Sequence, residues 1–369
     1  MSKKVLDYFL ELVQIDSESL CEGAIAAYLR AELECLGAEV YLDNAQEFTG
    51  GECGNVIGWF AGAPEIEPLF LCAHIDTVKP GKGVVPVIDG DRILSAGNTI
   101  LGADDKSGIA MILAVISEYL EKGSLPAPLE IVFTVSEEIG LLGAKALDIE
   151  KLRSKRGFAL DGNKLGEVVK ASPSQAGWQA KFIGKAVHAG IEPENGVNSI
   201  RAAAAAVLAI RDGRIDEVTT MNIGKINGGR ATNIVCEETE IAGEIRSHNN
   251  AKLEELSQQV REAFERTAKE FDCKLEFELQ LSFESMQIDE NDELVKISEA
   301  AYQQAGVEQK LVVNGGGSDA NVFAGKGLKT AVVGTGMQKI HSTKEYILLD
   351  DLQRGKDWLQ NLIKLWSEK

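Results

Sequence analysis

The sequence predicts an α/β protein, in which a mostly parallel sheet flanked by helices carries an inserted α+β domain. Strand-like apolar runs alternate with helical patterns up to residue 172 and again from residue 284, as in a parallel sheet covered on both faces. Between them, 173–283 has the order strand–helix–strand–strand–helix–strand, which is that of the ferredoxin-like arrangement. The chain of 369 residues is also longer than one hydrophobic core usually supports.

The first part of the chain begins with two helices. Apolar residues recur at helical spacing over 5–14, and Ile25, Tyr28, Leu29 and Leu33 form the apolar stripe of a second helix. Runs rich in β-branched and aromatic residues, bounded by glycine or proline, then predict strands. The predicted strands cover 39–42, 55–60, 68–71, 129–135 and 158–160, and a helix covers 106–120.

The character of the sequence changes near residue 173, where alternating strands replace the buried ones. We predict strands at 178–183, 219–226, 237–246 and 274–281, with helices at 198–211 and 251–271. The α/β pattern then returns with a helix at 291–305, a glycine-rich loop at 314–318, a strand at 330–333 and a helix at 350–367. The expected organisation is therefore one domain of 1–172 and 284–369, interrupted by a second domain of 173–283.

The composition excludes several classes of partner. A formal net charge of −19 argues against binding to nucleic acid or to anionic lipid, since both need a basic surface. No apolar run is long enough to span a bilayer, and Met1 to Lys4 leads into an amphipathic helix rather than a signal-peptide core. The six cysteines are scattered without a CxxC pair, which is typical of free thiols in a cytosolic chain. We expect a cytoplasmic protein.

The first chemical signal is an imidazole and a carboxylate two residues apart. His74 and Asp76 follow the apolar run 68–71, and side chains two apart in a strand point the same way. A metal-bound histidine usually donates its second ring N–H to an acceptor such as a carboxylate. Alone, the pair also fits a structural histidine at a strand end, so a metal site requires further ligands.

Five positions at strand ends or in loops supply such ligands: His74, Asp104, Glu138, Asp161 and His341. Besides the structural alternative for His74, Asp before a helix is commonly a cap and Glu after a strand is commonly solvated. Asp161 and His341 also fit a turn and a loop. Ligands of parallel sheets nevertheless gather at the C-terminal ends of strands. The joint placement of these five residues favours a metal site.

Two imidazoles and three carboxylates hold two divalent ions if one carboxylate bridges them. This mixture of N and O donors suits zinc, and also cobalt or manganese. Two metals roughly 3.5–4 Å apart are a recurring device for hydrolysis, because they activate a water and polarise the bond under attack. Glu137 is then the spare carboxylate, which takes the proton of the water and passes it to the leaving amine.

The chain resembles the co-catalytic di-zinc metallopeptidases that include peptidase T, glutamate carboxypeptidase and aminoacylase, and it is most similar to the peptidase T-like proteins. The matching motifs occur in the family's order over nearly the whole chain. They lie at 73–78, 102–108, 134–140, 160–162, 184–190, 315–321 and 341–342. The resemblance implies that the first domain is the family's zinc-peptidase catalytic domain, and that 173–283 is its lid and dimerisation domain.

The resemblance also implies a role for each candidate ligand. His74 and Asp161 are expected to hold one zinc ion, and Glu138 and His341 the other. Asp104 is expected to bridge the two ions, next to a peptide bond with Asp105 that is cis in relatives.

Two carboxylates beside the ligands receive catalytic roles by the same resemblance. Asp76 is expected to orient His74, and Glu137 is expected to be the general base. Catalysis in this interpretation is attack of a metal-activated water on the scissile carbonyl.

Three residues of the lid match positions that contact substrate in the family. His188 matches a histidine that, in dimeric relatives, reaches the partner's active site and steadies the oxyanion; its alternative is a turn histidine beside Ala189-Gly190. Asn233 and Arg246 match residues that bind carboxylate or carbonyl groups of the substrate. A guanidinium suits a carboxylate because its planar fork binds bidentately.

The glycine-rich loop is the last candidate for substrate binding. Gly316, Gly317 and Asn321 are expected to line a loop that offers backbone N–H groups to substrate, with a plain turn as the alternative. We interpret Lys106 and His248 as surface or helix-start residues. The loop matches neither the Walker A nor the dinucleotide-binding pattern.

The expected function is therefore hydrolysis of small peptides by a zinc-dependent exopeptidase, with aminotripeptidase as the closest analogy. The alternative is an N-acyl amino acid or amide hydrolase, of the aminoacylase or carboxypeptidase kind, that uses the same two-metal site. A catalytically silent binding module would need a lost ligand or base, and none is missing. The expected partners are a small peptide and a second copy of the chain, which relatives bind through the lid. Side-chain preference, peptide length and the native metal stay open.

Overall fold

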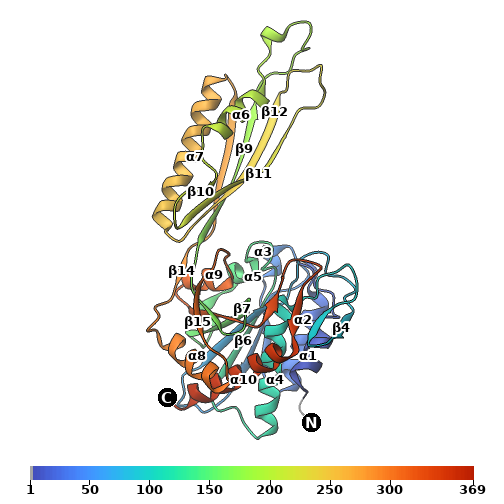
Figure 1. Ribbon diagram of the computed structural model, residues 1–369, viewed down its shortest axis with the longest axis vertical. Helices are drawn as coiled ribbons and strands as arrows, with labels where there is room; N and C mark the ends of the chain where they lie inside the picture. Colours follow the sequence, from blue (N-terminus) through green and yellow to red (C-terminus); the bar gives the residue numbers. More distant parts are fainter. Residues whose placement is uncertain (1–2) are drawn as a thin grey trace. The chain divides into compact units, whose positions relative to one another are not determined.

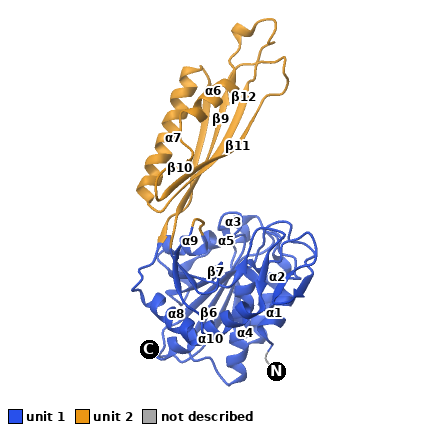
Figure 2. Cartoon of the chain, in the orientation of Figure 1, with its two compact units in different colours: residues 1–170, 287–314, 318–369 blue, residues 171–286, 315–317 orange. Residues whose placement is uncertain are grey.

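The computed structural model describes residues 3–369, and Met1 and Ser2 of the predicted N-terminal segment lie outside the described residues. The chain divides into two compact units (Figure 2). Unit 1 consists of 1–170, 287–314 and 318–369, and unit 2 of 171–286 and 315–317. The divisions after 170 and 286 lie close to the boundaries expected at 172 and 283. The glycines at 315–317 belong to unit 2, which no sequence pattern indicated.

Unit 1 is built around a nine-stranded sheet whose centre is parallel (Figure 1). The strand order is β1-β2-β6-β3-β7-β16-β8-β14, and β15 pairs with β8. β3 is parallel to both β6 and β7, and β16 is parallel to β7. The prediction of a mostly parallel sheet flanked by helices is therefore confirmed. The strands are β1 (Glu39–Leu42), β2 (Val56–Phe60), β3 (Leu69–His74), β6 (Leu129–Thr134), β7 (Arg156–Gly162), β8 (Glu167–Ser172), β14 (Met286–Gln287), β15 (Lys310–Val313) and β16 (Lys329–Gly334).

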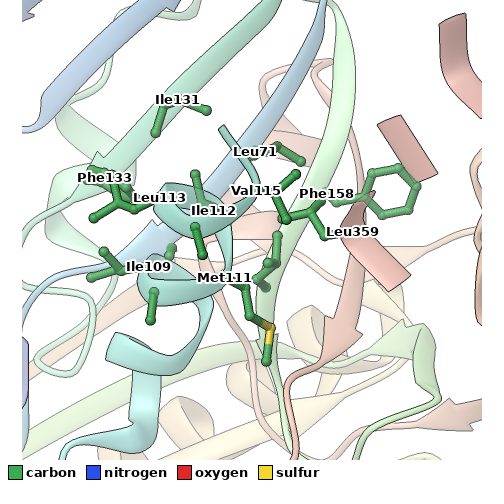
Figure 3. Close-up of a cluster of buried hydrophobic side chains, with 14 of the residues drawn as sticks. Leu71, Ile109, Met111, Ile112, Leu113, Val115, Ile131, Phe133, Phe158 and Leu359 are labelled. Atoms are coloured by element: carbon green, nitrogen blue, oxygen red, sulfur yellow. The ribbon is translucent and has the colours of Figure 1, made fainter. Parts of the chain in front are cut away.

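Helix α4 (Ala103–Glu121) packs its apolar side chains against the middle of this sheet. Figure 3 shows Ile112 of the helix among buried side chains that include Leu71 of β3 and Phe158 of β7. Burying a side chain of this size contributes about 1.5–3 kcal/mol. Gly108 allows the close approach, because a Cβ atom there would lie 2.6 Å from the carbonyl oxygen of Leu160. The packing fixes where the helix starts relative to the strand ends.

The remaining helices of unit 1 flank the sheet, and they include the first and last helices of the described chain. Apolar patterns predicted α1, α2, α8 and α10, whereas the short helices α3, α5 and α9 were not predicted. Within the described residues, every helix is too short or too polar to cross a lipid bilayer. The helices are α1 (Val5–Leu12), α2 (Gly23–Cys35), α3 (Gln46–Thr49), α5 (Leu142–Ala146), α8 (Glu293–Gln304), α9 (Asp319–Gly325) and α10 (Leu349–Ser367).

A second, four-stranded sheet in unit 1 was not predicted. Its order is β17-β18-β5-β4, and all its pairings are antiparallel. It joins the hairpin of β4 (Pro86–Asp89) and β5 (Arg92–Ser95) to β17 (Met337–Gln338) and β18 (Tyr346–Leu348). The connection from β17 to β18 carries His341, so this small sheet holds a candidate ligand from near the end of the chain.

Unit 2 has the predicted ferredoxin-like order with a short additional strand. Its sheet is antiparallel with the order β10-β11-β12-β9-β13. A buried aromatic cluster joins the sheet to α7, where the rings of Trp178 and Phe264 meet edge to face at 5.3 Å. The elements are β9 (Ser174–Ile183), α6 (Ser199–Leu208), β10 (Gly213–Arg214), β11 (Thr219–Gly228), β12 (Glu238–Ser247), α7 (Asn250–Glu270) and β13 (Lys274–Phe283).

Candidate metal centre

Three neighbouring strands bring candidate residues to one edge of the main sheet. β3 ends at His74, β7 contains Asp161 near its end, and the Glu137–Glu138 pair follows β6. These strands are adjacent and parallel, so their C-terminal ends meet at the same edge. This edge is where ligands of parallel sheets usually bind.

Asp104 lies between the two imidazole rings. Its Oδ1 atom is 3.0 Å from Nε2 of His74, and its Oδ2 atom is 3.2 Å from Nε2 of His341. The carboxylate comes from the start of α4, and the peptide bond between Asp104 and Asp105 is cis. One carboxylate thus has an oxygen beside each ring, as a bridging ligand requires.

The other two carboxylates complete two groups around this bridge. Asp161 Oδ1 lies 3.8 Å from His74 Nε2, and Glu138 Oε2 lies 3.0 Å from His341 Nε2. The donor atoms of His74, Asp104 and Asp161 lie within 4.8 Å of one another, and so do those of Asp104, Glu138 and His341. The structure therefore brings together all five residues that the sequence suggested as ligands.

These groups fit divalent metal ions in both chemistry and size. Zinc takes imidazole nitrogen and carboxylate oxygen at about 2.0–2.2 Å in a tetrahedral arrangement, which puts neighbouring donor atoms roughly 3.3 Å apart. The separations of 3.0 and 3.8 Å to His74 and of 3.2 and 3.0 Å to His341 bracket that spacing. The same donors suit cobalt and manganese, so geometry does not identify the metal.

Charge in the centre favours a cation at each ring. Hydrogen bonds with Asp104 and Glu138 raise the pKa of His341 to about 10. Burial alone would lower the pKa of His74, but hydrogen bonds with Asp104 and Asp76 raise it well above its usual value. The carboxylates thus stabilise positive charge where the two ions of the prediction would lie.

Asp76 contacts His74 through its backbone carbonyl oxygen and through its carboxylate. His74 Nδ1 lies 3.0 Å from the backbone carbonyl oxygen of Asp76 and 3.4 Å from its carboxylate. A donor bond from Nδ1 leaves Nε2 available as a ligand. The carboxylate accepts N–H groups of Glu137 at 2.9 Å and Glu138 at 3.2 Å, and the hydroxyl of Ser19 at 2.6 Å. Asp76 therefore connects the end of β3, which carries His74, to the turn that carries Glu137 and Glu138.

Glu137 is placed beside the ligands without belonging to either group around Asp104. One of its carboxylate oxygens lies within 4.8 Å of ligand atoms of His74 and Glu138. Burial raises the pKa of Glu137 well above its usual value, and the nearby carboxylates of Asp161 and Asp319 raise it further. A carboxylate with a raised pKa is a stronger base, which suits the predicted role in proton transfer.

The turn that carries Glu137 is held in an unusual conformation by Glu22. Ser136 has a φ of +54°, which few residues other than glycine adopt. The buried carboxylate of Glu22 accepts both the N–H of Ser136 at 3.0 Å and its hydroxyl at 2.8 Å. His341 also has a positive φ, of +58°. Such conformations persist where surrounding contacts fix them, and they cluster at functional sites.

The predicted lid residues lie in unit 2, and two of them are neighbours there. His188 is exposed, and its segment forms a β-bridge with Ile234. The N–H of Ala189 donates to the carbonyl oxygen of Asn233 at 2.9 Å. Gly190 N–H donates to Nδ1 of His188 at 3.1 Å, so in the neutral ring Nε2 carries the proton and is the free donor. That tautomer suits an oxyanion donor.

Arg246 and the glycine-rich loop have structural partners of their own. Arg246 on β12 pairs with Glu244 at 2.9 Å and donates to the carbonyl oxygen of Gly315 at 3.1 Å. A Cβ atom on Gly317 would lie 2.3 Å from the ring of Phe283. Packing against this ring is therefore enough to explain why position 317 is glycine. Their roles in substrate binding, and that of Gly316, stay predictions.

Asn321 is buried, and it helps to begin helix α9. Its side-chain oxygen accepts the N–H of Ser318 at 3.1 Å, within a capping box. The buried side chain has a structural use at this position, and its contact with substrate stays a prediction.

Lys106 lies at the start of α4, as expected of a helix-start residue, but it is buried and not on the surface. Several other buried residues were not predicted. Lys106 is 1% exposed, and its Nζ donates to the carbonyl oxygen of Ile15 at 2.7 Å, whereas lysine at a helix start is usually on the surface. Burial lowers its pKa to about 7. Glu22, Glu345 and Asp319 are also buried beside the centre. No spacing in the sequence distinguishes them from the rest of the 57 acidic residues of the chain.

Comparisons with known proteins agree with this geometry. The family model described as Peptidase family M20/M25/M40 matches residues 70–365. The uncharacterized protein YqjE of Bacillus subtilis is 38% identical over 363 residues, with 98% of each chain covered. The solved structure of aminopeptidase PepT from Bacillus cereus is 39% identical, with a TM-score of 0.91 and coverage of 99% of this chain and 98% of that one. A tripeptidase from Staphylococcus aureus is 35% identical, with a TM-score of 0.94 and full coverage of both chains.

Proposed function

The chain belongs to peptidase family M20/M25/M40, and we propose that it is a two-metal exopeptidase that hydrolyses small peptides, with tripeptides as its main substrates. Membership confirms the predicted family, fold and class of reaction, the hydrolysis of peptide bonds. The observation that carries the rest is the Asp104 carboxylate between His74 and His341, with Glu137 beside them. The names of the solved relatives, an aminopeptidase and a tripeptidase, support the choice of substrate.

The proposed ligands divide into two sets that share Asp104. His74 and Asp161 serve one ion, and Glu138 and His341 serve the other, as their groupings support. Two such ions, when bound, polarise a carbonyl and lower the pKa of an attacking water. Zinc is the proposed metal because its preferred ligands match the set. Elemental analysis of the purified protein, with reconstitution by zinc, cobalt and manganese in turn, tests this choice.

The residues of the chain carry the proton and hold the reacting groups. Glu137 accepts a proton from the attacking water and delivers it to the leaving amine nitrogen. Asp76 fixes the backbone of Glu137 through the hydrogen bond at 2.9 Å, so the base is positioned before substrate arrives. Nε2–H of His188 is the proposed donor to the negative charge that develops on the carbonyl oxygen.

Unit 2 is proposed to supply the remaining substrate contacts and the dimer interface. Asn233 and Arg246 are proposed to bind carboxylate or carbonyl groups of the substrate. The loop of Gly316, Gly317 and Asn321 is proposed to offer backbone N–H groups to it. Homodimerisation through unit 2 and location in the cytoplasm are proposed with this function. Light scattering of the intact protein measures the assembly directly.

A substrate panel tests the proposed activity against its alternative. The panel contains a tripeptide, the same tripeptide with an acetylated amino terminus, the corresponding dipeptide and an N-acyl amino acid. Exopeptidase action on amino termini predicts the highest kcat/KM for the free tripeptide and a large loss on acetylation. Faster hydrolysis of the N-acyl amino acid would instead favour the amide-hydrolase alternative.

A further inference from the structure

Glu345 is a buried carboxylate that none of the proposed catalytic steps uses. It is 3% exposed and lies in the connection from β17 to β18, four residues after His341. Its Oε2 atom accepts the N–H of Leu101 at 2.7 Å and that of Gly102 at 2.9 Å. Its Oε1 atom accepts the N–H of Asp104 at 3.1 Å. One side chain thus accepts three backbone N–H groups from the loop that carries the proposed bridging ligand.

The backbone of this loop departs from helical geometry at the start of α4. Gly102 has a φ of +80°, and Asp104 has non-helical angles, with φ −81° and ψ 104°. The N–H groups at the start of a helix have no partner within that helix, and a negative charge is favoured beside them. Glu345 supplies hydrogen-bond acceptors for these N–H groups at the start of α4. The conformation of the loop at Asp104 therefore depends on a residue far away in sequence.

The segment of Glu345 also carries His341, which is a second ligand of one of the two ions that Asp104 is proposed to bridge. The N–H of Glu345 donates to the carbonyl oxygen of Ser342 at 3.1 Å, which closes a turn directly after His341. The next residue, Tyr346, pairs with Leu94 in the small sheet. His341 and Glu345 are thus fixed on one short, braced turn. The carboxylate of Glu345 connects this turn to the backbone of Asp104.

We propose that Glu345 is a positioning residue that holds the bridging carboxylate of Asp104 in register with His341, and that it is required for tight binding of the metal pair. The inference rests on the proposed two-metal function. Glu345 does not touch a metal in this proposal; it acts through the backbone of Asp104. Loss of residues that orient metal ligands typically costs about 10–100-fold in metal affinity.

The main variant is Glu345→Gln, which keeps the shape of the side chain. Its amide has one accepting oxygen, and its NH2 group meets a backbone N–H instead of accepting from it. The matched control is Glu130→Gln in the same unit. Glu130 is 2% exposed and accepts the N–H groups of Arg153 at 3.1 Å and Ser154 at 2.7 Å. It lies near the start of β6, whereas the candidate ligands follow the strand's end.

Cobalt binding to the metal-stripped, full-length proteins provides a readout other than activity. Absorption spectra during titration, with a competing chelator for tight binding, give the affinity of each of the two ions. Glu345→Gln is expected to lower the affinity for at least one ion by about 10–100-fold. Glu130→Gln is expected to bind both ions with the affinity of the wild type. Thermal unfolding of the stripped proteins measures how much each buried carboxylate contributes to the fold.

Two results would overturn the inference. One is unchanged affinity for both ions in Glu345→Gln, and the other is an equal loss in Glu130→Gln, which would indicate a general effect of buried carboxylates. If the glutamine variant does not fold, Glu345→Asp takes its place with the same expectation, since its shorter side chain keeps the charge but not the reach. A wild type that fails to bind two ions would refute the proposed metal centre itself, so the two failures are distinguishable.

Discussion

The carboxylate of Asp76 accepts the backbone N–H of Glu137 at 2.9 Å. The same residue presents its carbonyl oxygen to Nδ1 of His74 at 3.0 Å. A proposed ligand and the proposed base are therefore fixed by one side chain and its backbone. A change at this residue is expected to disturb both.

Asp76→Asn should lower kcat by about 10–100-fold, in the range seen when residues that orient metal ligands are lost. The amide keeps one acceptor and presents NH2 to the other backbone N–H. The check is kcat together with metal content. Asp292→Asn is the matched control, because Asp292 accepts the N–H of Leu294 at 2.9 Å at the start of α8. Equal losses in the two variants would contradict a specific role for Asp76.

Glu137→Ala should reduce turnover by about 10²–10⁴-fold, the usual contribution of a general base, while both metal ions stay bound. Glu138→Gln is the contrasting variant, because it removes a proposed ligand and should lower the metal content. Steady-state kinetics and elemental analysis of the two proteins separate base from ligand. A turnover rate of Glu137→Ala within tenfold of the wild type would contradict the assignment of Glu137 as the general base.

His188→Ala should leave metal content unchanged and lower kcat by about 10²–10³-fold, as expected for loss of one donor to an oxyanion. His188→Gln, which retains an N–H donor, should recover part of the rate. His248→Ala provides the control from the same unit. Unchanged turnover in His188→Ala would mean that this histidine does not supply the donor.

Removal of metal by a chelator should abolish activity, and zinc or cobalt should restore it. Carboxylates raise the pKa of His341 to about 10, so the stripped protein carries an imidazolium there near neutral pH. A metal ion binds the neutral ring, and binding must therefore release protons. Calorimetry in buffers of different ionisation enthalpy should detect this release, and affinity should rise with pH toward the pKa of the folded state. Binding without proton release would contradict His341 as a ligand.

The same raised pKa has a consequence for the stability of the stripped protein. A histidine whose pKa is higher in the folded than in the unfolded state stabilises the fold fully below about pH 6.5. That contribution is lost as the pH rises through the folded value of about 10. Replacement of His341 by Ala in the stripped protein should remove this part of the pH dependence of thermal unfolding.

Sequence patterns predicted the centre of the main sheet and the residues at its strand ends. Leu129 to Thr134 forms a strand as its apolar, β-branched run indicated, and the acidic pair after it lies at the candidate site. The pairing partners were not predictable, because periodicity gives the existence of a strand and not its neighbours. This is why the strand order, and the parallel contact of β3 with both β6 and β7, emerged only from the structure.

The unpredicted parts depend on contacts between distant segments. β17 has two residues and β18 three, too few for a recognisable alternation. β18 pairs with the 92–95 strand, and β17 pairs with β18, so the turn that carries His341 and Glu345 is held against this hairpin. Lys106 follows two aspartates at a helix start, where an exposed lysine is the common case, yet the Ile15 segment covers it. Burial of this kind leaves no local pattern in the sequence.

The placement of His341 and Glu345 on the small sheet affects the order of events during synthesis of the chain. His74, Asp104, Glu138 and Asp161 precede unit 2 in the sequence, whereas the turn between β17 and β18 is translated after it. A nascent chain that has not reached this turn lacks both a proposed imidazole ligand and the carboxylate that is proposed to hold Asp104. The proposed metal centre therefore receives its last ligand only after unit 2 has been synthesised.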